Sequence, residues 1–205
     1  MRSTVKKNTR DVAAGGAGSA GATGVGTAYD FDGSFDARSG FDDVRFALSG
    51  QLDRELDTLL LARASLDRLL NALLVRAPQR RTALGLAAFE LDDWKASSSR
   101  VEPSAARAAF SQLARELRQR VRSSDELGRI GESSICIVLL GCEAHVLANV
   151  AERLRLGLDG KPLGAPTDGL HASLSVAVVS AYPRHGGPSA QALVAELCGA
   201  LERRC

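Results

Sequence analysis

The chain has 205 residues, of which 45% are hydrophobic, and its formal net charge is only +2. This is enough for one ordinary domain with extensions, and the near-neutral charge argues against broad electrostatic binding to nucleic acid or membranes. No apolar run approaches the ~20 residues of a membrane span, so we expect a cytoplasmic protein without membrane insertion. No cysteine pair has CxxC spacing, so we expect no metal site. The near-neutral charge also leads us to expect no DNA binding.

Residues 1–38 are rich in Gly, Ala, Ser and Thr and show no hydrophobic periodicity, which predicts a flexible tail. Within this tail, Tyr29, Phe31 and Phe35 alternate with aspartates. This aromatic-acidic segment could dock on a partner or fold against its own domain, and the sequence leaves both interpretations open.

Residues 39–80 are predicted to form a leading helical segment. From Asp43 to about Leu74, leucines recur at three- and four-residue spacing with charges between them, as on the buried face of a helix. Such a stripe usually belongs to the core, but it could also pair with the same helix of a second copy in a homodimer.

Residues 81–205 alternate strand and helix patterns, with a hairpin in the middle. We expect strands at 81–91, 127–130, 135–140 and 171–183, and helices at 103–121, 142–158 and 190–204. This order predicts an α/β (α+β) fold in which a central mixed β-sheet is flanked by helices.

The chain resembles the GGDEF domain, the family of diguanylate cyclases, in several segments taken in order. LSGQLDR (48–54) resembles the family's LTGLPNR, FELDDWK (89–95) resembles the DxDxFK strand end, and RIGESSI (129–135) occupies the RxGGDEF hairpin. VAERLR (150–155) and ASLSVAVVSAYP (172–183) match the following helix and strand. The resemblance implies a GGDEF-like fold, whose catalytic members hold metal ions with carboxylates to join two GTP molecules.

The chain departs from the family pattern at the positions that carry this chemistry. Both acids of the hairpin motif are serines, and a neutral hydroxyl is a poor substitute for a carboxylate on Mg²⁺. Glu132 lies one residue early, a shift that tends to turn its side chain to the other face. The family's guanine-holding Asn-Asp pair aligns with Ser98 and Ser99. The vestigial active-site positions are Glu90, Asp92, Gly131, Glu132, Ser133 and Ser134.

A second family motif is retained. The inhibitory site for the product, cyclic di-GMP, has the signature RxxD five residues before the GGDEF motif, which matches Arg122 to Asp125 ahead of Gly131. Arg153 matches an additional arginine of that site. Arginine can donate two hydrogen bonds to guanine O6 and N7, and aspartate can accept from N1 and N2. The alternative is a surface ion pair of little energetic value.

These residues predict a catalytically inactive GGDEF-like domain that acts as a receptor for cyclic di-GMP, with no cofactor. It would relay the signal to a protein partner, such as one in exopolysaccharide synthesis or secretion. Two alternatives stay open: a nucleotide-independent protein-interaction scaffold, and a weak diguanylate cyclase that uses Glu90, Asp92 and Glu132.

Overall fold

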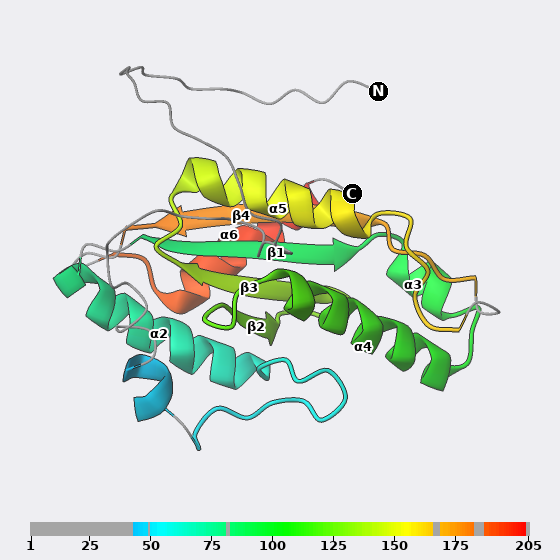
Figure 1. The fold of residues 1–205 in the computed structure, drawn as a ribbon, viewed down its shortest axis with the longest axis horizontal. Coiled ribbons are helices and arrows are strands. Elements are labelled where there is room, and N and C mark those ends of the chain that lie inside the picture. Colours follow the sequence, from blue (N-terminus) through cyan, green and yellow to red (C-terminus); the bar gives the residue numbers. More distant parts are fainter. Residues whose placement is uncertain (1–42, 49, 81–82, 166–168, 183–186, 204–205) are drawn as a thin grey trace, which may run out of the picture.

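The computed structural model of the chain describes residues 43–48, 50–80, 83–165, 169–182 and 187–203, and the tail expected at 1–38 lies outside them. Among the described residues, no helix combines the length and the apolar character that a membrane span requires. The elements in chain order are α2 (Arg63–Arg80), β1 (Leu84–Leu91), α3 (Trp94–Ser98), α4 (Pro103–Arg120), β2 (Glu126–Arg129), β3 (Ser134–Leu140), α5 (Ala144–Leu158), β4 (Leu174–Ala181) and α6 (Ala190–Glu202) (Figure 1).

The predicted α+β fold is confirmed, but the sheet is antiparallel rather than mixed. Its strand order is β2-β3-β1-β4, and β1 pairs antiparallel with both β3 and β4, as β2 does with β3. The reason is that each helical crossover skips one place in the sheet. β3 lies between β1 and β2, and β1 lies between β3 and β4, as in a split β-α-β unit. An isolated bridge between Leu61 and Gly128 is parallel.

The sheet has a hydrophobic layer on each face. α4 and α5 cover one face, where Phe89 of β1 is fully buried, and α2 and α6 cover the other, where Leu86 is fully buried. Successive residues of β1 alternate between these layers, as the pleat of a strand requires. Figure 1 shows α4 and α5 in front of the strands and α6 behind them.

The leading stripe of leucines does not form the single helix predicted from Asp43 to Leu74. Residues 43–47 are helical, residues 50–62 are irregular, and α2 begins at Arg63. Leu61 instead donates its N–H to Leu127 and accepts from the N–H of Arg129, each at 2.9 Å, and so pairs with the edge of β2. An edge strand offers unpaired backbone groups, and here this tertiary pairing overrides the helical periodicity.

The burial of Cys136 in the core can be tested through the pH dependence of the free energy of unfolding. Cys136 lies on β3 in the layer beneath α2 and α6, and burial, with nearby Cys198, raises the pKa of its thiol from 9.0 to about 12. Above about pH 9 the unfolded chain loses this proton while the folded chain keeps it, so stability falls as pH rises toward about 12. From about pH 8 to about pH 10 we expect this group to lower the free energy of unfolding by about 1.4 kcal/mol.

Urea unfolding of the wild type and of Cys136→Ala at both pH values measures this contribution. The substitution also removes packing, so the comparison uses only the change between the two pH values in each protein. Equal changes in the two proteins would contradict the expected titration of Cys136.

Candidate functional site

The end of β1 and the β2–β3 hairpin meet at the position of the family's metal site. Glu90 pairs with Ser134 across β1 and β3. The hydroxyls of Ser133 and Ser134 donate to Oε1 of Glu90 at 3.3 and 3.2 Å. The carboxylate therefore has two neutral donors from the two hairpin positions where catalytic relatives carry acids.

Asp92, just beyond the end of β1, is held in a similar way. The Ser173 hydroxyl donates to Oδ2 of Asp92 at 2.7 Å, and the Asp92 N–H donates to the Ser173 carbonyl at 2.9 Å. No group of three histidine, cysteine or acidic side chains in the described part of the chain is arranged to hold a metal ion. These donors do not fit the pair of hard cations that the family's chemistry uses, because hydroxyl groups take the place of carboxylates.

Glu132, the acid that lies one residue early in the hairpin, is separated from the other two acids. Glu90 and Asp92 line one cavity of about 590 Å³. Glu132 lines a neighbouring cavity of about 580 Å³, bounded by residues 55–58, α3 and α4. The one-residue offset thus places Glu132 in a different cavity from Glu90 and Asp92, although Trp94, Lys95 and Ser99 line both cavities.

The 580 Å³ cavity has an aromatic and cationic wall that the sequence analysis did not identify. The rings of Trp94 and Phe110 lie with centroids 6.4 Å apart, and the Arg129 guanidinium carbon is 4.1 Å from the Phe110 centroid. Arg129 Nε also lies 2.8 Å from Oε1 of Glu55. Arg129 matches the arginine of the resembling RxGGDEF motif, which could have pointed to this wall. Its aromatic partner on α4, Phe110, is visible only in the fold.

Ser98 and Ser99, which align with the family's guanine-holding pair, line the same cavity. Their hydroxyls donate to backbone carbonyls of α3, Ser98 to Lys95 at 3.5 Å and Ser99 to Ala96 at 2.9 Å. These side chains satisfy their own helix and lack the carboxylate and amide groups that would read a guanine edge.

The RxxD turn, residues 122–125, follows the end of α4. The Arg122 N–H donates to Oδ2 of Asp125 at 3.0 Å, and the Asp125 N–H donates to the Arg122 carbonyl at 3.1 Å. Asp125 is only 4% exposed. In this structure the Asp125 carboxylate therefore stabilises the turn by accepting from the Arg122 N–H, a role that the sequence analysis did not assign.

Arg118 ties the RxxD turn back to α4. Its guanidinium donates to the carbonyls of both Arg122 and Asp125. Burial lowers the pKa of Arg118, while the carboxylates of Glu126 and Asp125 act to raise it. Arg118 lies in the last turn of α4, where a basic side chain can bond carbonyls at the helix end, and this position was a signal that could have found it.

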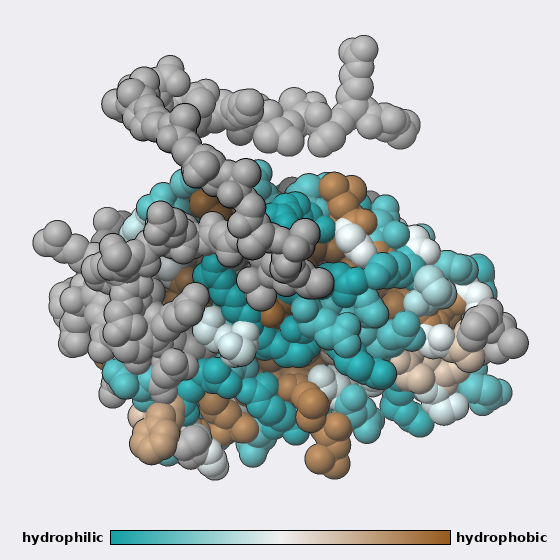
Figure 2. Space-filling model, viewed as in Figure 1, coloured by the Kyte–Doolittle hydropathy of each residue, from teal (hydrophilic) through white to brown (hydrophobic). Residues whose placement is uncertain are grey.

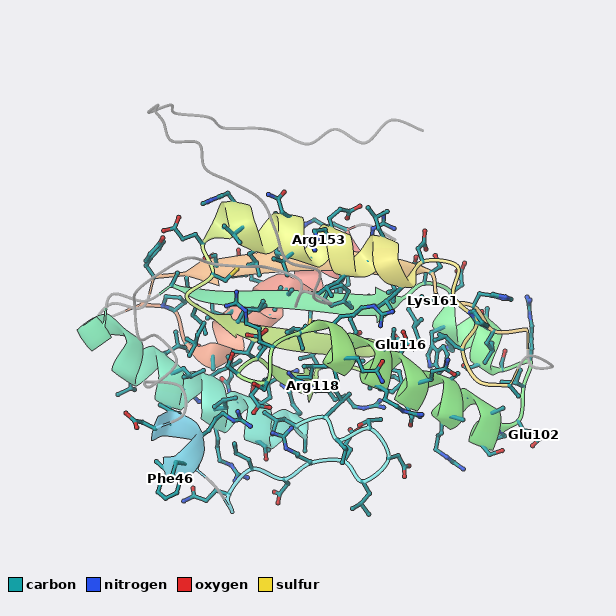
Figure 3. The ribbon with its side chains drawn as sticks, viewed as in Figure 1. Phe46, Glu102, Glu116, Arg118, Arg153 and Lys161 are labelled. Atoms are coloured by element: carbon teal, nitrogen blue, oxygen red, sulfur yellow. The ribbon has the colours of Figure 1, made fainter. Side chains whose placement is uncertain are left out.

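Arg153 is exposed on α5, which runs antiparallel to α4 on the same face of the sheet (Figure 3). At one end of this helix pair, Lys161 Nζ lies 3.4 Å from Oε2 of Glu116. One turn along, the Arg120 side chain reaches α5 at Gly157. Arg153 lies one helical turn before Gly157 on α5, and the RxxD turn follows Arg120 at the end of α4. Because the two helices are antiparallel, Arg153 and the RxxD turn lie toward the same end of the pair.

The thiol of Cys142 shows that the charges of the RxxD turn lie near the start of α5. Burial and the Asp125 carboxylate together raise the pKa of Cys142 to about 11, and the Arg122 guanidinium opposes the rise. Cys142 precedes the first residue of α5 by two positions. The turn is therefore close to the N-terminal part of the helix that carries Arg153.

Comparison with known proteins gives a consistent result. The family model described as "Diguanylate cyclase, GGDEF domain" matches residues 56–201. The family match begins at residue 56 and therefore does not test the resemblance of LSGQLDR (48–54). Among curated proteins no match was found.

Several solved structures are similar to this chain. The GGDEF domain of FimX from Pseudomonas aeruginosa has a TM-score of 0.66 and 19% identity, covering 74% of this chain and 94% of that one. The GGDEF domain of DgcB from Caulobacter crescentus, in complex with c-di-GMP, has a TM-score of 0.62 and 17% identity, covering 73% and 88%. Diguanylate cyclase SiaD from Pseudomonas aeruginosa, in complex with its activator SiaC, has a TM-score of 0.63 and 21% identity, covering 80% and 64%.

Acids placed in the hairpin test whether the two serine hydroxyls stabilise the Glu90 carboxylate. In Ser133→Asp/Ser134→Glu, three carboxylates meet without a hydroxyl donor, so without metal we expect the melting temperature to fall by roughly 2–4 °C per kcal/mol of repulsion. Mg²⁺ at about 10 mM should recover most of this loss, because it binds only the folded acidic site.

Thermal melts with EDTA or Mg²⁺ measure both effects, and the neutral variant Ser133→Asn/Ser134→Gln is the matched control. The wild type and the control should not respond to Mg²⁺. A rise in the wild-type melting temperature as large as that of the acidic variant would contradict the loss of the metal site.

Proposed function

The chain belongs to the GGDEF domain family, and from this we propose that it is a receptor that binds cyclic di-GMP at the RxxD turn without acting as a diguanylate cyclase. The observation that carries the proposal is a contrast between neighbouring parts of one domain. The metal site has serines in place of two acids, whereas Arg122 and Asp125 are retained in the family's spacing and lie toward the same end of the helix pair as Arg153.

The loss of synthesis follows from charge. Phosphoryl transfer needs cations that offset the charge developing on the phosphate oxygens. The donors around Glu90 and Asp92 are hydroxyls, which do not supply the negative charge that would hold such cations. We therefore derive no catalytic step for this chain and treat the six vestigial positions as structural.

The proposed binding chemistry uses two arginines and one aspartate. Arg122 is half-buried and Arg153 is exposed, so both guanidinium groups can reach a ligand that carries two phosphates and two guanines. Asp125 is buried in the turn, so guanine reaches its carboxylate only when the turn rearranges. The GGDEF domain of DgcB was solved with c-di-GMP, which supports the choice of ligand.

We further propose that the signal passes to a protein partner in the cytoplasm, of the kind that serves exopolysaccharide synthesis or secretion. The complex of SiaD with SiaC is one in which a related protein takes a protein partner. Phe46, Leu56 and Leu59 are 82%, 94% and 69% exposed. Figure 2 shows apolar side chains along the lower edge of the molecule, beside the irregular segment before α2.

A calorimetric titration with cyclic di-GMP tests the receptor proposal. We expect micromolar or tighter binding, and Arg122→Ala and Arg153→Ala should each weaken it by at least about tenfold, since each removes a charge-assisted contact. Arg155→Ala is the matched control, because Arg155 pairs with Glu152 at 2.8 Å on the surface of the same helix.

Two substitutions at Asp125 separate its roles in the turn and in binding. In Asp125→Asn the amide oxygen can still accept from the Arg122 N–H, but the charge that would accept from guanine is gone, so affinity should fall while the melting temperature holds. Asp125→Ala should lower both. Absence of binding heat and of any melting shift in the wild type would reject the receptor proposal.

Two cheaper experiments address the alternatives. Partner capture that is unaffected by cyclic di-GMP and by Arg122→Ala would favour the scaffold, which the exposed apolar side chains also suit. Incubation with GTP and Mn²⁺ followed by product analysis tests the weak cyclase, and formation of cyclic di-GMP would overturn the assignment of Glu90, Asp92 and Glu132 as vestigial.

A further inference from the structure

A buried carboxylate lies directly after the RxxD turn. Glu126, the first residue of β2, is 1% exposed. Its Oε1 lies 2.7 Å from Nε of Arg45, and its Oε2 accepts from Nη2 of Arg54 at 2.8 Å. Both arginines come from the leading segment, here residues 43–62, so a single carboxylate fastens that segment to the domain.

The same arginines also hold other parts of the structure. Arg45 donates through Nη1 to the carbonyl of Ser123, inside the RxxD turn, at 3.2 Å. Arg118, which holds the turn from the α4 side, lies within the electrostatic influence of Glu126 and of Arg45 and Arg54. These four charged side chains, Glu126 with Arg45, Arg54 and Arg118, form one connected group that we call the Glu126 cluster.

Arg54 extends the cluster to a strained loop. Its Nη1 donates to the carbonyl of Leu59 at 3.0 Å. Leu59 has a φ of 58°, a left-handed conformation that is costly for a bulky side chain and persists only when its surroundings impose it. In this loop the side chains of Leu59 and Leu56 are both exposed to solvent. Backbone bonds between Glu55 and Leu59 and between Glu55 and Leu60 close this apolar loop, and Arg54 links it to Glu126.

Because a buried carboxylate is stable only while it keeps its cationic partners, the cluster responds as a unit. The RxxD turn cannot shift without disturbing the Arg45 contact to Ser123 or the Arg118 contacts to the turn. Any such shift redistributes the arginines around Glu126. These contacts run without interruption from the turn to the leading segment.

We propose that the Glu126 cluster couples the RxxD turn to the leading segment, so that the state of the turn sets how the segment and its apolar side chains are presented. With cyclic di-GMP as the ligand of the turn, which rests on the proposed function, the cluster is the route by which binding changes the partner-facing surface. Thermodynamic linkage makes the coupling reciprocal: loosening the segment loosens the turn.

Hydrogen exchange of the full chain without ligand tests the coupling itself. Asp125→Ala, which removes the acceptor for the Arg122 N–H, should speed amide exchange in residues 43–62 by about fivefold or more. In the other direction, Arg45→Ala should speed exchange in residues 122–126 by a similar factor. Protection that persists in α6 and β3 shows that neither variant is globally unfolded.

The control is Arg155→Ala, whose Nη2 lies 2.8 Å from Oε1 of Glu152 on α5, outside the cluster; it should leave residues 122–126 unchanged. Glu126→Gln, which keeps the shape of the side chain and removes its charge, should act like Arg45→Ala. Faster exchange confined to the turn in Asp125→Ala, with residues 43–62 unaltered, would overturn the coupling whether or not cyclic di-GMP binds.

A second arm adds cyclic di-GMP at saturation. In the wild type the ligand should change exchange in both the turn and residues 43–62, and in Arg45→Ala the change should be confined to the turn. Affinity should weaken by no more than about the factor by which exchange of the ligand-free turn rises in that variant. An unchanged response of residues 43–62 in Arg45→Ala would overturn the assigned route. Absence of ligand binding in the wild type would reject the ligand, and the ligand-free arm would still decide the coupling.

Discussion

The pairing of β1 with β3 on one side and β4 on the other fixes where the functional side chains of this domain lie. The register that sets Glu90 opposite Ser134 brings the hairpin to the end of β1, and the register with β4 brings Ser173 to Asp92. Hydroxyl donors then satisfy both carboxylates. Carboxylates gathered at one sheet end repel each other unless cations or donors offset their charge, and here the serine hydroxyls are such donors.

Much of this fold could be predicted from the sequence because its elements depend on local patterns. The strand ending at Leu91, the helix beginning at Pro103 and the hairpin before Ile135 each follow from apolar periodicity and from turn or capping residues. The antiparallel sheet was not predicted, because strand order depends on which strand inserts between two others. The break in the leading helix was missed for a similar reason: the competitor for Leu61 is the distant edge of β2.

The candidate site shows the same division. The residue types and spacing of Arg122, Asp125 and Arg153 are visible in the sequence, and so are the two serines of the hairpin. The direction of the Asp125 carboxylate was not, because whether an aspartate faces solvent or its own turn depends on a few torsion angles. The dependence of Glu126 on two arginines more than seventy residues away in sequence, Arg45 and Arg54, is equally invisible without the fold.

Leu61 forms hydrogen bonds with backbone groups of β2 that would otherwise be unpaired at the edge of the sheet. Such edges recruit strands from other molecules, and natural proteins cover them. The segment before α2 therefore also protects the protein against self-association. A proteolytic fragment or shortened gene product that started at Arg63 would keep all four strands and most of the core, yet it would be prone to aggregate.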